Sequence, residues 1–179
     1  EGLFTSKIIH FFPDHPKEEE EQLNNRYIRE HFLTSIFTLA EFRKIKHFKQ
    51  LYNFQEKHKY LFMTYNQDIM KKIGIIITNT NYLIFEEVKE KYYKLLLKLF
   101  FKKPTRTSHI KTIIHIIDYF KKDLLSNEKI KILDLLSKYK ESKVSIYSIQ
   151  KILKEWSIIK NNHYLIGQSY FQPYPKELI

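Results

Sequence analysis

The sequence predicts an all-α fold, a single compact multi-helix bundle of about seven to nine helices. Three glycines and five prolines in 179 residues are too few for the many tight turns of a sheet-rich fold. From Asn25 onward, apolar residues recur every three or four positions, which is the period of an amphipathic helix. The chain is 43% hydrophobic and 28% charged, so it is neither disordered nor fibrous, and its length suits one domain with a short appendage.

The first four expected helices follow one another with short connections. The first begins at Asn25, and its apolar stripe consists of Ile28, Phe32, Ile36, Leu39 and Phe42. The second covers residues 48–65, the third 68–77 and the fourth 85–101. Pro104 ends this run because proline cannot continue a helix.

Three further helices complete the expected bundle. Thr105 caps a fifth helix that runs to about Lys122, since a threonine oxygen accepts a hydrogen bond from a free amide of the first turn. Ser126, followed by Asn127, opens a sixth helix that ends at Tyr139. Ser145 opens a seventh, which ends at Ile159. Residues 74–77 and 143–146 are the only stretches in which the sequence leaves room for a short strand.

The N-terminal lead differs in composition from the rest of the chain. It contains Pro13 and Pro16, followed by four acidic residues at 18–21, and the chain opens with Glu1 rather than methionine. We therefore interpret residues 1–24 as the remnant of an upstream domain with an acidic linker. Residues 25–179 are interpreted as one helical domain.

The excess of basic residues points to an anionic partner. Lysine and arginine number 31 against 20 acidic residues, which gives a net charge of +11, and nucleic acid is the commonest partner of such a domain. Lysine supplies 27 of these cations, a bias typical of A+T-rich genes, which accounts for part of the excess. Residues 1–30 carry 4 basic and 7 acidic side chains, whereas residues 31–179 carry 27 and 13, so the charge belongs to the helical body.

Several classes of protein are excluded by residues that the sequence lacks. It contains no cysteine, which removes disulfides, zinc ribbons, iron–sulfur ligation and thiol nucleophiles, and we expect no cofactor in this chain. Lysines interrupt every apolar run before it reaches the ~20 residues of a membrane span. No secretory signal is visible, so we expect a cytoplasmic protein without a membrane partner.

The fourth and fifth expected helices carry the strongest concentration of cations. Lysines at 91, 94, 98 and 102 share one side of the fourth helix, where they can follow a phosphate backbone. The alternative is an ordinary solvated face, stabilised by pairing of Glu87 with Lys91 and of Glu90 with Lys94.

The start of the fifth helix is the sharper candidate. Lys102, Lys103 and Arg106 surround a helix N-terminus capped by Thr105, and free amide donors favour an anion there. The apolar stripe of this helix is expected to consist of Ile110, Ile113, Ile114, Ile117 and Phe120. Its far side carries Lys111, His115 and Lys122, with Asp118 between them. The alternative is a lysine-coated helix pair without a ligand.

The histidines show no chelating or catalytic spacing. His58 shares an apolar stripe with Leu51, Phe54 and Leu61, which favours a hydrogen-bonded core histidine over a ligand or base. His109 and His115 lie six residues apart, on different faces of a helix, so they cannot share a metal. No H-E-x-x-H, Gly-rich phosphate loop or G-x-S-x-G occurs, and we expect no enzyme activity from this chain alone.

The C-terminal tail is aromatic and contains prolines. Its rings can stack on exposed bases with Gln168 beside them, but docking of the tail on the core is the favoured interpretation. The aromatic residues in question are Tyr164, Tyr170, Phe171 and Tyr174.

Several of these stretches also carry a family resemblance. They are His58-Lys59 with Met63, Gly74, Pro104-Thr105-Arg106 with His109, His115, Tyr119-Phe120-Lys121-Lys122, and Tyr164-Leu165 with Gln168, Tyr170 and Pro173-Tyr174-Pro175. Together they resemble the YbgA-like domain family (domain of unknown function 1722) over about residues 25–178. Gly2-Leu3-Phe4 and the acidic linker are similar to the junction at which such domains follow a TudS-like desulfidase domain.

The resemblance implies a division of labour between two domains. The upstream TudS-like domain holds an iron–sulfur cluster and removes sulfur from thiolated uracil, and the YbgA-like part supplies tRNA binding. From the charge pattern and the resemblance together, the residues predicted to bind RNA are Lys91, Lys94, Lys98, Lys102, Lys103, Thr105, Arg106, His109, Lys111, His115, Lys121, Lys122, His58, Lys59 and Gln168. The chain departs from the family pattern at Lys111, where asparagine is usual, at Asp118, where glycine is usual, and at Ser145 and Ser148, where prolines are usual.

The sequence thus predicts an RNA-binding accessory domain, with tRNA or another structured RNA as partner, that presents thiolated uridine to a TudS-like desulfidase domain. One alternative is a protein-interaction or scaffolding domain whose basic coat reflects codon bias. The other is a hydrolase or transferase that uses Arg106, His109 and His58, which requires these three side chains to converge on one pocket.

Overall fold

A computed structural model describes residues 20–78 and 84–178, and within these ranges the fold is all-α, as predicted. The lead of the chain and its junction motif at residues 2–4 fall on residues 1–19, outside the described ranges. The elements are η1 (Glu20–Asn24), α2 (Arg26–Arg43), α3 (Phe48–Tyr65), α4 (Gln67–Thr78), α5 (Phe85–Leu99), α6 (Arg106–Ile117), α7 (Ser126–Lys140), α8 (Ile146–Ile159), α9 (His163–Ile166), η2 (Ser169–Phe171) and η3 (Lys176–Leu178).

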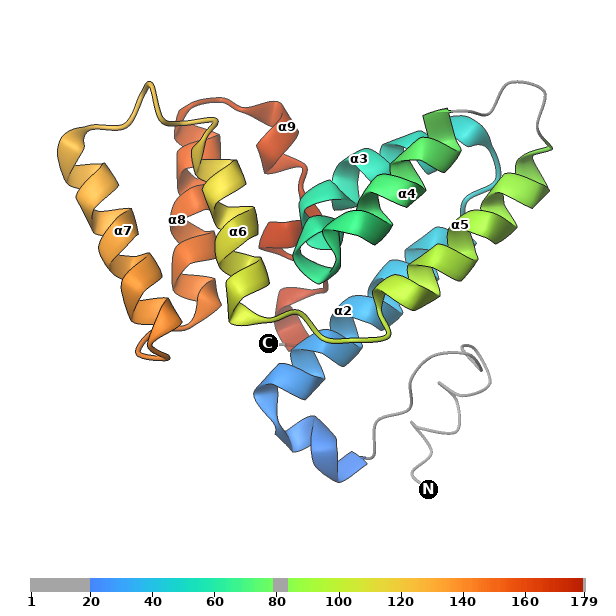
Figure 1. The fold of residues 1–179 in the computed structure, drawn as a ribbon, viewed down its shortest axis with the longest axis horizontal. Coiled ribbons are helices and arrows are strands. Elements are labelled where there is room, and N and C mark those ends of the chain that lie inside the picture. The colour runs from blue at the N-terminus through green and yellow to red at the C-terminus, as the bar shows by residue number, and fades with distance from the viewer. Residues whose placement is uncertain (1–19, 79–83, 179) are drawn as a thin grey trace.

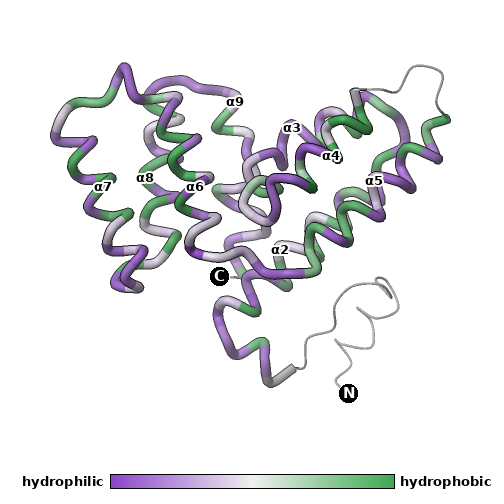
Figure 2. Tube along the Cα trace, viewed as in Figure 1, coloured by the Kyte–Doolittle hydropathy of each residue, from purple (hydrophilic) through white to green (hydrophobic). Residues whose placement is uncertain are grey.

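The helices form two adjoining halves, each with its own apolar core (Figure 1). Helices α2 to α5 enclose the first core, which includes Leu39, Phe42 and Phe62. Helices α6 to α9 and η2 enclose the second, which includes Ile113 and Trp156. Polar and apolar residues alternate along the helices, most visibly along α5, α6 and α8 (Figure 2), as expected where one face of each helix is buried.

Helix α3 joins the two halves. Its Tyr60 belongs to the second core, and its Met63 packs against both cores. The hydroxyl of Thr64 on α3 donates a buried hydrogen bond of 2.9 Å to the hydroxyl of Thr112 on α6. The tail then packs on the same helix, with Tyr170 and Phe171 buried in the second core, which confirms docking of the tail over base stacking by these two rings.

Most helix starts agree with the sequence prediction because polar caps fix them. The side chain of Asn25 accepts the backbone N–H groups of Tyr27 and Ile28 at the start of α2. Thr105 accepts the N–H of Ser108, whose own hydroxyl accepts the N–H of Thr105, in a capping box that begins α6.

The end of α6 and its buried face differ from the prediction. The helix ends at Ile117 and not near Lys122, because the N–H groups of Tyr119 and Phe120 bond carbonyls three residues back, so the chain continues as turns. Ile114 is 50% exposed, whereas Ile116 is buried beside Ile113. Residues 74–77 are helical, and neither they nor residues 143–146 form a strand.

Candidate functional site

A cavity of about 550 Å³ lies where the two halves meet. Five segments line it: the start of α2, the end of α3, residues 103–109, the face of α8 that carries Ile146 and Gln150, and the tail from Tyr170 to Lys176. Tyr139 adds to the lining from the end of α7. This volume lies within the range of about 300–1,000 Å³ that is typical of small-molecule sites.

Two histidine–tyrosine pairs stand in the cavity wall. Nδ1 of His31 lies 3.0 Å from the hydroxyl of Tyr65, and Nδ1 of His109 lies 3.1 Å from the hydroxyl of Tyr170. Burial lowers the pKa of His109 to about 4, so its imidazole is neutral at pH 7. His109 therefore gives the wall a neutral ring with hydrogen-bonding atoms.

Cations outnumber carboxylates among the residues that line the cavity, by six to two. Arg26 is held by Glu30 in an ion pair of 2.7 Å, and Nζ of Lys154 donates to the side-chain oxygen of Gln172 at 3.4 Å. Lys103 and Lys151 are exposed and have no ion-pair partner among the described residues. The six cations are Arg26, Lys103, Arg106, Lys151, Lys154 and Lys176, and the two carboxylates are Glu30 and Glu155.

Arg106 lines the cavity as a clamp between helices. Its Nη1 donates to the backbone carbonyl of Tyr139 at 3.0 Å, and its Nη2 donates to the hydroxyl of Tyr27 at 2.8 Å. The guanidinium carbon also lies 5.6 Å and 5.4 Å from the centroids of these two tyrosine rings. Arg106 thus ties α6 to α2 and α7, and two of its nitrogens are already engaged within the protein.

His58 is a core histidine, as its apolar stripe predicted. It is 1% exposed, and its Nδ1 lies 2.7 Å from the hydroxyl of Ser169, while its Nε2 lies 3.3 Å from a carboxylate oxygen of Glu41. Burial lowers the pKa of His58. Burial also opposes ionisation of Glu41, but hydrogen bonds from His58 and Lys57 outweigh it and lower the pKa of Glu41 to about 2. An imidazole so enclosed has no face left for a phosphate, so the prediction that His58 contacts RNA directly is wrong.

Gln168 is also buried and engaged. It is 4% exposed, and its side-chain amide bonds the backbone of α3 at Tyr60 and Glu56. Its role is to attach the tail to α3, and the prediction that it contacts RNA is wrong for the same reason as for His58.

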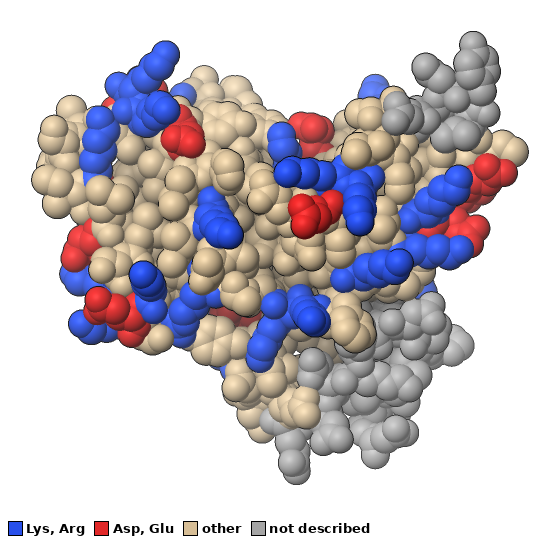
Figure 3. Space-filling model, in the orientation of Figure 1, with Lys and Arg blue, Asp and Glu red and all other residues tan. Residues whose placement is uncertain are grey.

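The other candidate lysines and His115 lie on several elements, and all are exposed except the half-buried Lys59. Lys91, Lys94 and Lys98 are on α5, and of the two ion pairs expected there, only Glu90 with Lys94 forms among the described residues, at 2.6 Å. Lys102 follows α5, Lys111 and His115 lie on α6, and Lys121 and Lys122 follow α6. On the face drawn in Figure 3, lysines and arginines are spread over both halves with acidic side chains between them.

Besides Lys94, two further candidate lysines have partners within the protein. Nζ of Lys59 lies 5.9 Å from the centroid of the Tyr164 ring, and Nζ of Lys121 lies 3.8 Å from a carboxylate oxygen of Asp118. The Lys121–Asp118 pair is at the surface, where such ion pairs contribute little to stability.

Comparison with known proteins places the chain in a family. Residues 59–175 match the family model described as "Protein of unknown function (DUF1722)". The chain belongs to this family. It is also 20% identical over 149 residues, which are 80% of this chain and 88% of the relative, to the "Uncharacterized protein YbgA" of Escherichia coli (strain K12). No solved structure matches.

The DUF1722 match covers one part of the cavity wall. Residues 103–109, the end of α7, the α8 face and most of the lining tail lie within the matched range, whereas Tyr27, Glu30 and His31 on α2 lie before it. Sequence reasoning missed His31, Tyr65, Lys151 and Lys154 as lining residues. No short-range pattern identifies them, because they lie on α2, α3 and α8, three segments that are distant in sequence.

The hydrolase or transferase alternative requires three side chains in one pocket. Arg106 and His109 both line the cavity of this DUF1722 domain, but His58 does not. Within residues 20–78 and 84–178, no group of three or more histidine, aspartate or glutamate side chains is placed to hold a metal ion. In the same ranges, no helix is long and apolar enough to cross a membrane.

Proposed function

We propose that this DUF1722 chain is an RNA-binding accessory domain whose partner is tRNA or another structured RNA. In this proposal it works in the cytoplasm and presents a thiolated uridine to a TudS-like desulfidase domain. The chain has no cysteine, so the thiolates that hold an iron–sulfur cluster come from that other domain. The catalytic step belongs to the other domain, and this chain supplies affinity and position.

The observation that carries the proposal is the large number of lysines without a counter-ion. Of the 27 lysines, Lys7 and Lys17 lie outside the described ranges, which leaves 25. Ion pairs within the described part of the chain engage five of them, namely Lys57, Lys94, Lys121, Lys138 and Lys143. Exposed cations without internal partners are what a phosphate backbone needs, because each contact releases condensed counter-ions.

A salt series of binding to total tRNA tests the proposal. With about four to six phosphate contacts, a fourfold rise in salt is expected to weaken binding by about ten- to a thousandfold. Fluorescence anisotropy of labelled tRNA between 50 and 200 mM KCl, a range in which such slopes are resolved, measures the effect. A flat salt profile contradicts the proposal.

A matched pair of double variants tests the location of the RNA. Lys91→Ala with Lys98→Ala removes two charges from α5, and Lys129→Ala with Lys131→Ala removes two exposed charges from α7, at the far edge of the other half. The α5 variant is expected to reduce the log–log salt slope by about 1.4 to 1.8, and the α7 variant to leave it unchanged. An equal reduction of the salt slope in both variants indicates that the net charge of the protein attracts RNA non-specifically.

One observation favours the protein-interaction alternative. Ile130 and Leu133, three residues apart on α7, are 69% and 64% exposed, so an apolar strip of this helix faces solvent. If total tRNA binds weakly and the α5 variant binds as wild type does, this strip becomes the better candidate for the functional surface.

A further inference from the structure

The cavity between the halves combines aromatic walls with a cationic rim. Seven aromatic side chains line it, and they come from α2, α3, α7, α8 and the tail. They are Tyr27, Tyr65, Tyr139, Tyr147, Tyr170, Phe171 and Tyr174. Aromatic faces stack on nucleobases whatever the base, since every base has a π-face. Such a lining suits a flat, unsaturated ring better than an aliphatic chain.

His109 adds a polar atom to these walls. The Tyr170 hydroxyl engages its Nδ1, and its Nε2 has no hydrogen-bond partner among the described residues. Because burial keeps the ring neutral at pH 7, Nε2 either donates or accepts, according to the tautomer. A nucleobase edge carries both donors and acceptors, so it can satisfy His109 in either form.

The rim supplies the complement to an anionic group. Lys151 and Lys154 lie on the α8 face that lines the cavity, and Lys103 lies on the α5–α6 connection. Of the two lining carboxylates, Glu30 is paired with Arg26, which leaves Glu155 as the carboxylate without an ion pair among the described residues. An entering phosphate therefore meets more free positive than negative charge.

We propose that this cavity binds one nucleoside monophosphate, with the base against the exposed rings of Tyr27 and Tyr147 and the phosphate at Lys103 and Lys151. The bound nucleotide can come from two sources. It is either a free mononucleotide or one nucleotide of a bound RNA that has left its stack. The second source rests on the RNA-binding function proposed above. An extruded nucleotide is read in this way in other RNA-recognising proteins, by stacking and by bonds to the base edge.

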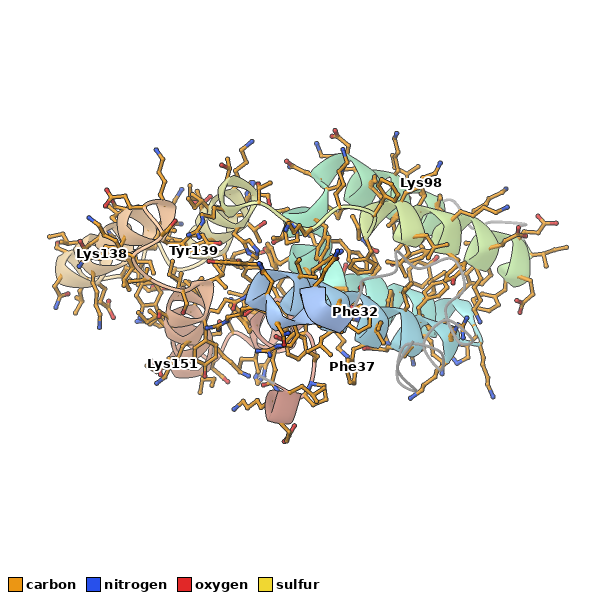
Figure 4. All side chains as sticks on the ribbon, turned by 90° about the horizontal axis from the view of Figure 1, so that it is seen from below. Phe32, Phe37, Lys98, Lys138, Tyr139 and Lys151 are labelled. Carbon is orange, nitrogen blue, oxygen red and sulfur yellow. The ribbon has the colours of Figure 1, made fainter. Side chains whose placement is uncertain are left out.

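Isothermal titration calorimetry with uridine 5′-monophosphate (UMP) on the intact chain tests the site. Lys151→Ala is expected to weaken UMP binding about tenfold, the loss that follows removal of one charge-assisted hydrogen bond. Lys129→Ala is the matched control for Lys151, which projects from α8 (Figure 4), because Lys129 is also an exposed lysine but does not line the cavity. It is expected to bind UMP as wild type does. Inorganic phosphate and uridine are each expected to bind more weakly than UMP.

A second variant blocks the cavity itself. Ile146→Trp places a larger side chain in the lining, and it is expected to abolish UMP binding while the melting curve still shows a folded protein. No saturable UMP binding by wild type overturns the proposal. Equal affinity for UMP and phosphate overturns the role of the rings, and UMP binding that survives both Lys151→Ala and Ile146→Trp overturns the location.

Competition with tRNA distinguishes the two sources. Release of bound UMP by saturating tRNA supports the extruded nucleotide. Simultaneous binding of tRNA and UMP overturns that source and supports a free mononucleotide. Absence of tRNA binding while UMP still binds overturns the RNA-binding function and supports the cavity as a mononucleotide site.

Discussion

The side-chain oxygen of Gln168 lies 3.3 Å from the backbone nitrogen of Tyr60 and accepts its N–H, although 108 residues separate the two in sequence. The side-chain nitrogen of Gln168 donates to the carbonyl of Glu56 at 2.7 Å. Glu56 and Tyr60 are four residues apart in α3, so these two backbone groups are the ones that bond each other in a regular α-helix. The side-chain amide of Gln168 thus bonds both the donor and the acceptor of one helical backbone pair, and it fixes the tail to α3.

Gln168→Glu is expected to destabilise the protein strongly. The carboxylate keeps the size and the acceptor, but it faces the Glu56 carbonyl without a proton to donate, in a site that is 4% exposed. The free energy of unfolding is expected to fall by about 2 to 4 kcal/mol, measured by urea denaturation. Gln67→Glu is the control, because Gln67 is exposed in the first turn of α4 and the change there is expected to be small. Similar losses in both variants contradict the bridging role.

Arg106→Ala tests the clamp between α6, α2 and α7. Loss of its two hydrogen bonds is expected to lower the free energy of unfolding by about 3 kcal/mol and the Tm by about 10 °C. Tyr27→Phe removes one of the two bonds and is expected to cost about 1 kcal/mol. Arg106→Lys is expected not to restore the stability of wild type, because one ammonium group cannot reproduce two diverging donors. If Arg106→Ala melts like wild type but binds tRNA weakly, Arg106 contacts phosphate and not its tyrosine partners.

The stability of the protein is expected to fall as the pH is lowered from 7 to 4. Burial lowers the pKa of His109 to about 4, against 6.5 for an ordinary histidine, so in this window the unfolded chain binds a proton that the folded chain excludes. The difference is worth about 3 kcal/mol, fully present above pH 6.5 and lost as the pH falls to the folded-state pKa. The lowered pKa of His58 acts in the same direction.

His109→Gln is the variant that identifies the group. It keeps a hydrogen-bonding side chain without a titrating ring, and urea denaturation at several pH values is expected to show a shallower loss of stability. His115→Gln, an exposed position on the same helix, is expected to retain the slope of wild type. If the His109→Gln protein loses stability as steeply as wild type when the pH falls, a group other than His109 binds the proton.

Local features of this chain were predictable because their causes are local. Asn25 and Thr105 mark helix starts through bonds to amides two or three residues away, so the residue type is the signal. His58 was correctly placed in a core because its helical stripe is apolar. Ile114 was wrongly assigned to the buried face of α6. This helix is rich in isoleucine on more than one side, so the apolar pattern does not show which side is buried.

Contacts between distant segments were not predictable in this way. Arg106 was expected at a phosphate, yet its partners are Tyr27, 79 residues earlier, and a backbone carbonyl 33 residues later. The cavity likewise exists because α2 and the tail meet α8. The position of Lys151 in the pattern of α8 alone does not indicate a binding site. Periodicity gives the face of each helix, whereas the packing of helices decides which faces meet.

Ser169 is expected to resist a fluorophosphonate probe, the reagent that labels activated serines. Its hydroxyl lies 2.7 Å from Nδ1 of His58, whose other nitrogen lies 3.3 Å from Glu41, an order of groups that resembles the serine, histidine and acid of a hydrolase. Ser169 is 5% exposed and His58 1%, however, and neither lines the cavity, so a substrate cannot reach the hydroxyl. Intact-mass spectrometry is expected to show no adduct. Ser169→Ala is instead expected to lower the free energy of unfolding by about 1 to 3 kcal/mol, since it leaves a buried imidazole nitrogen without its partner. An adduct that Ser169→Ala abolishes reverses this conclusion and makes the His58 cluster catalytic.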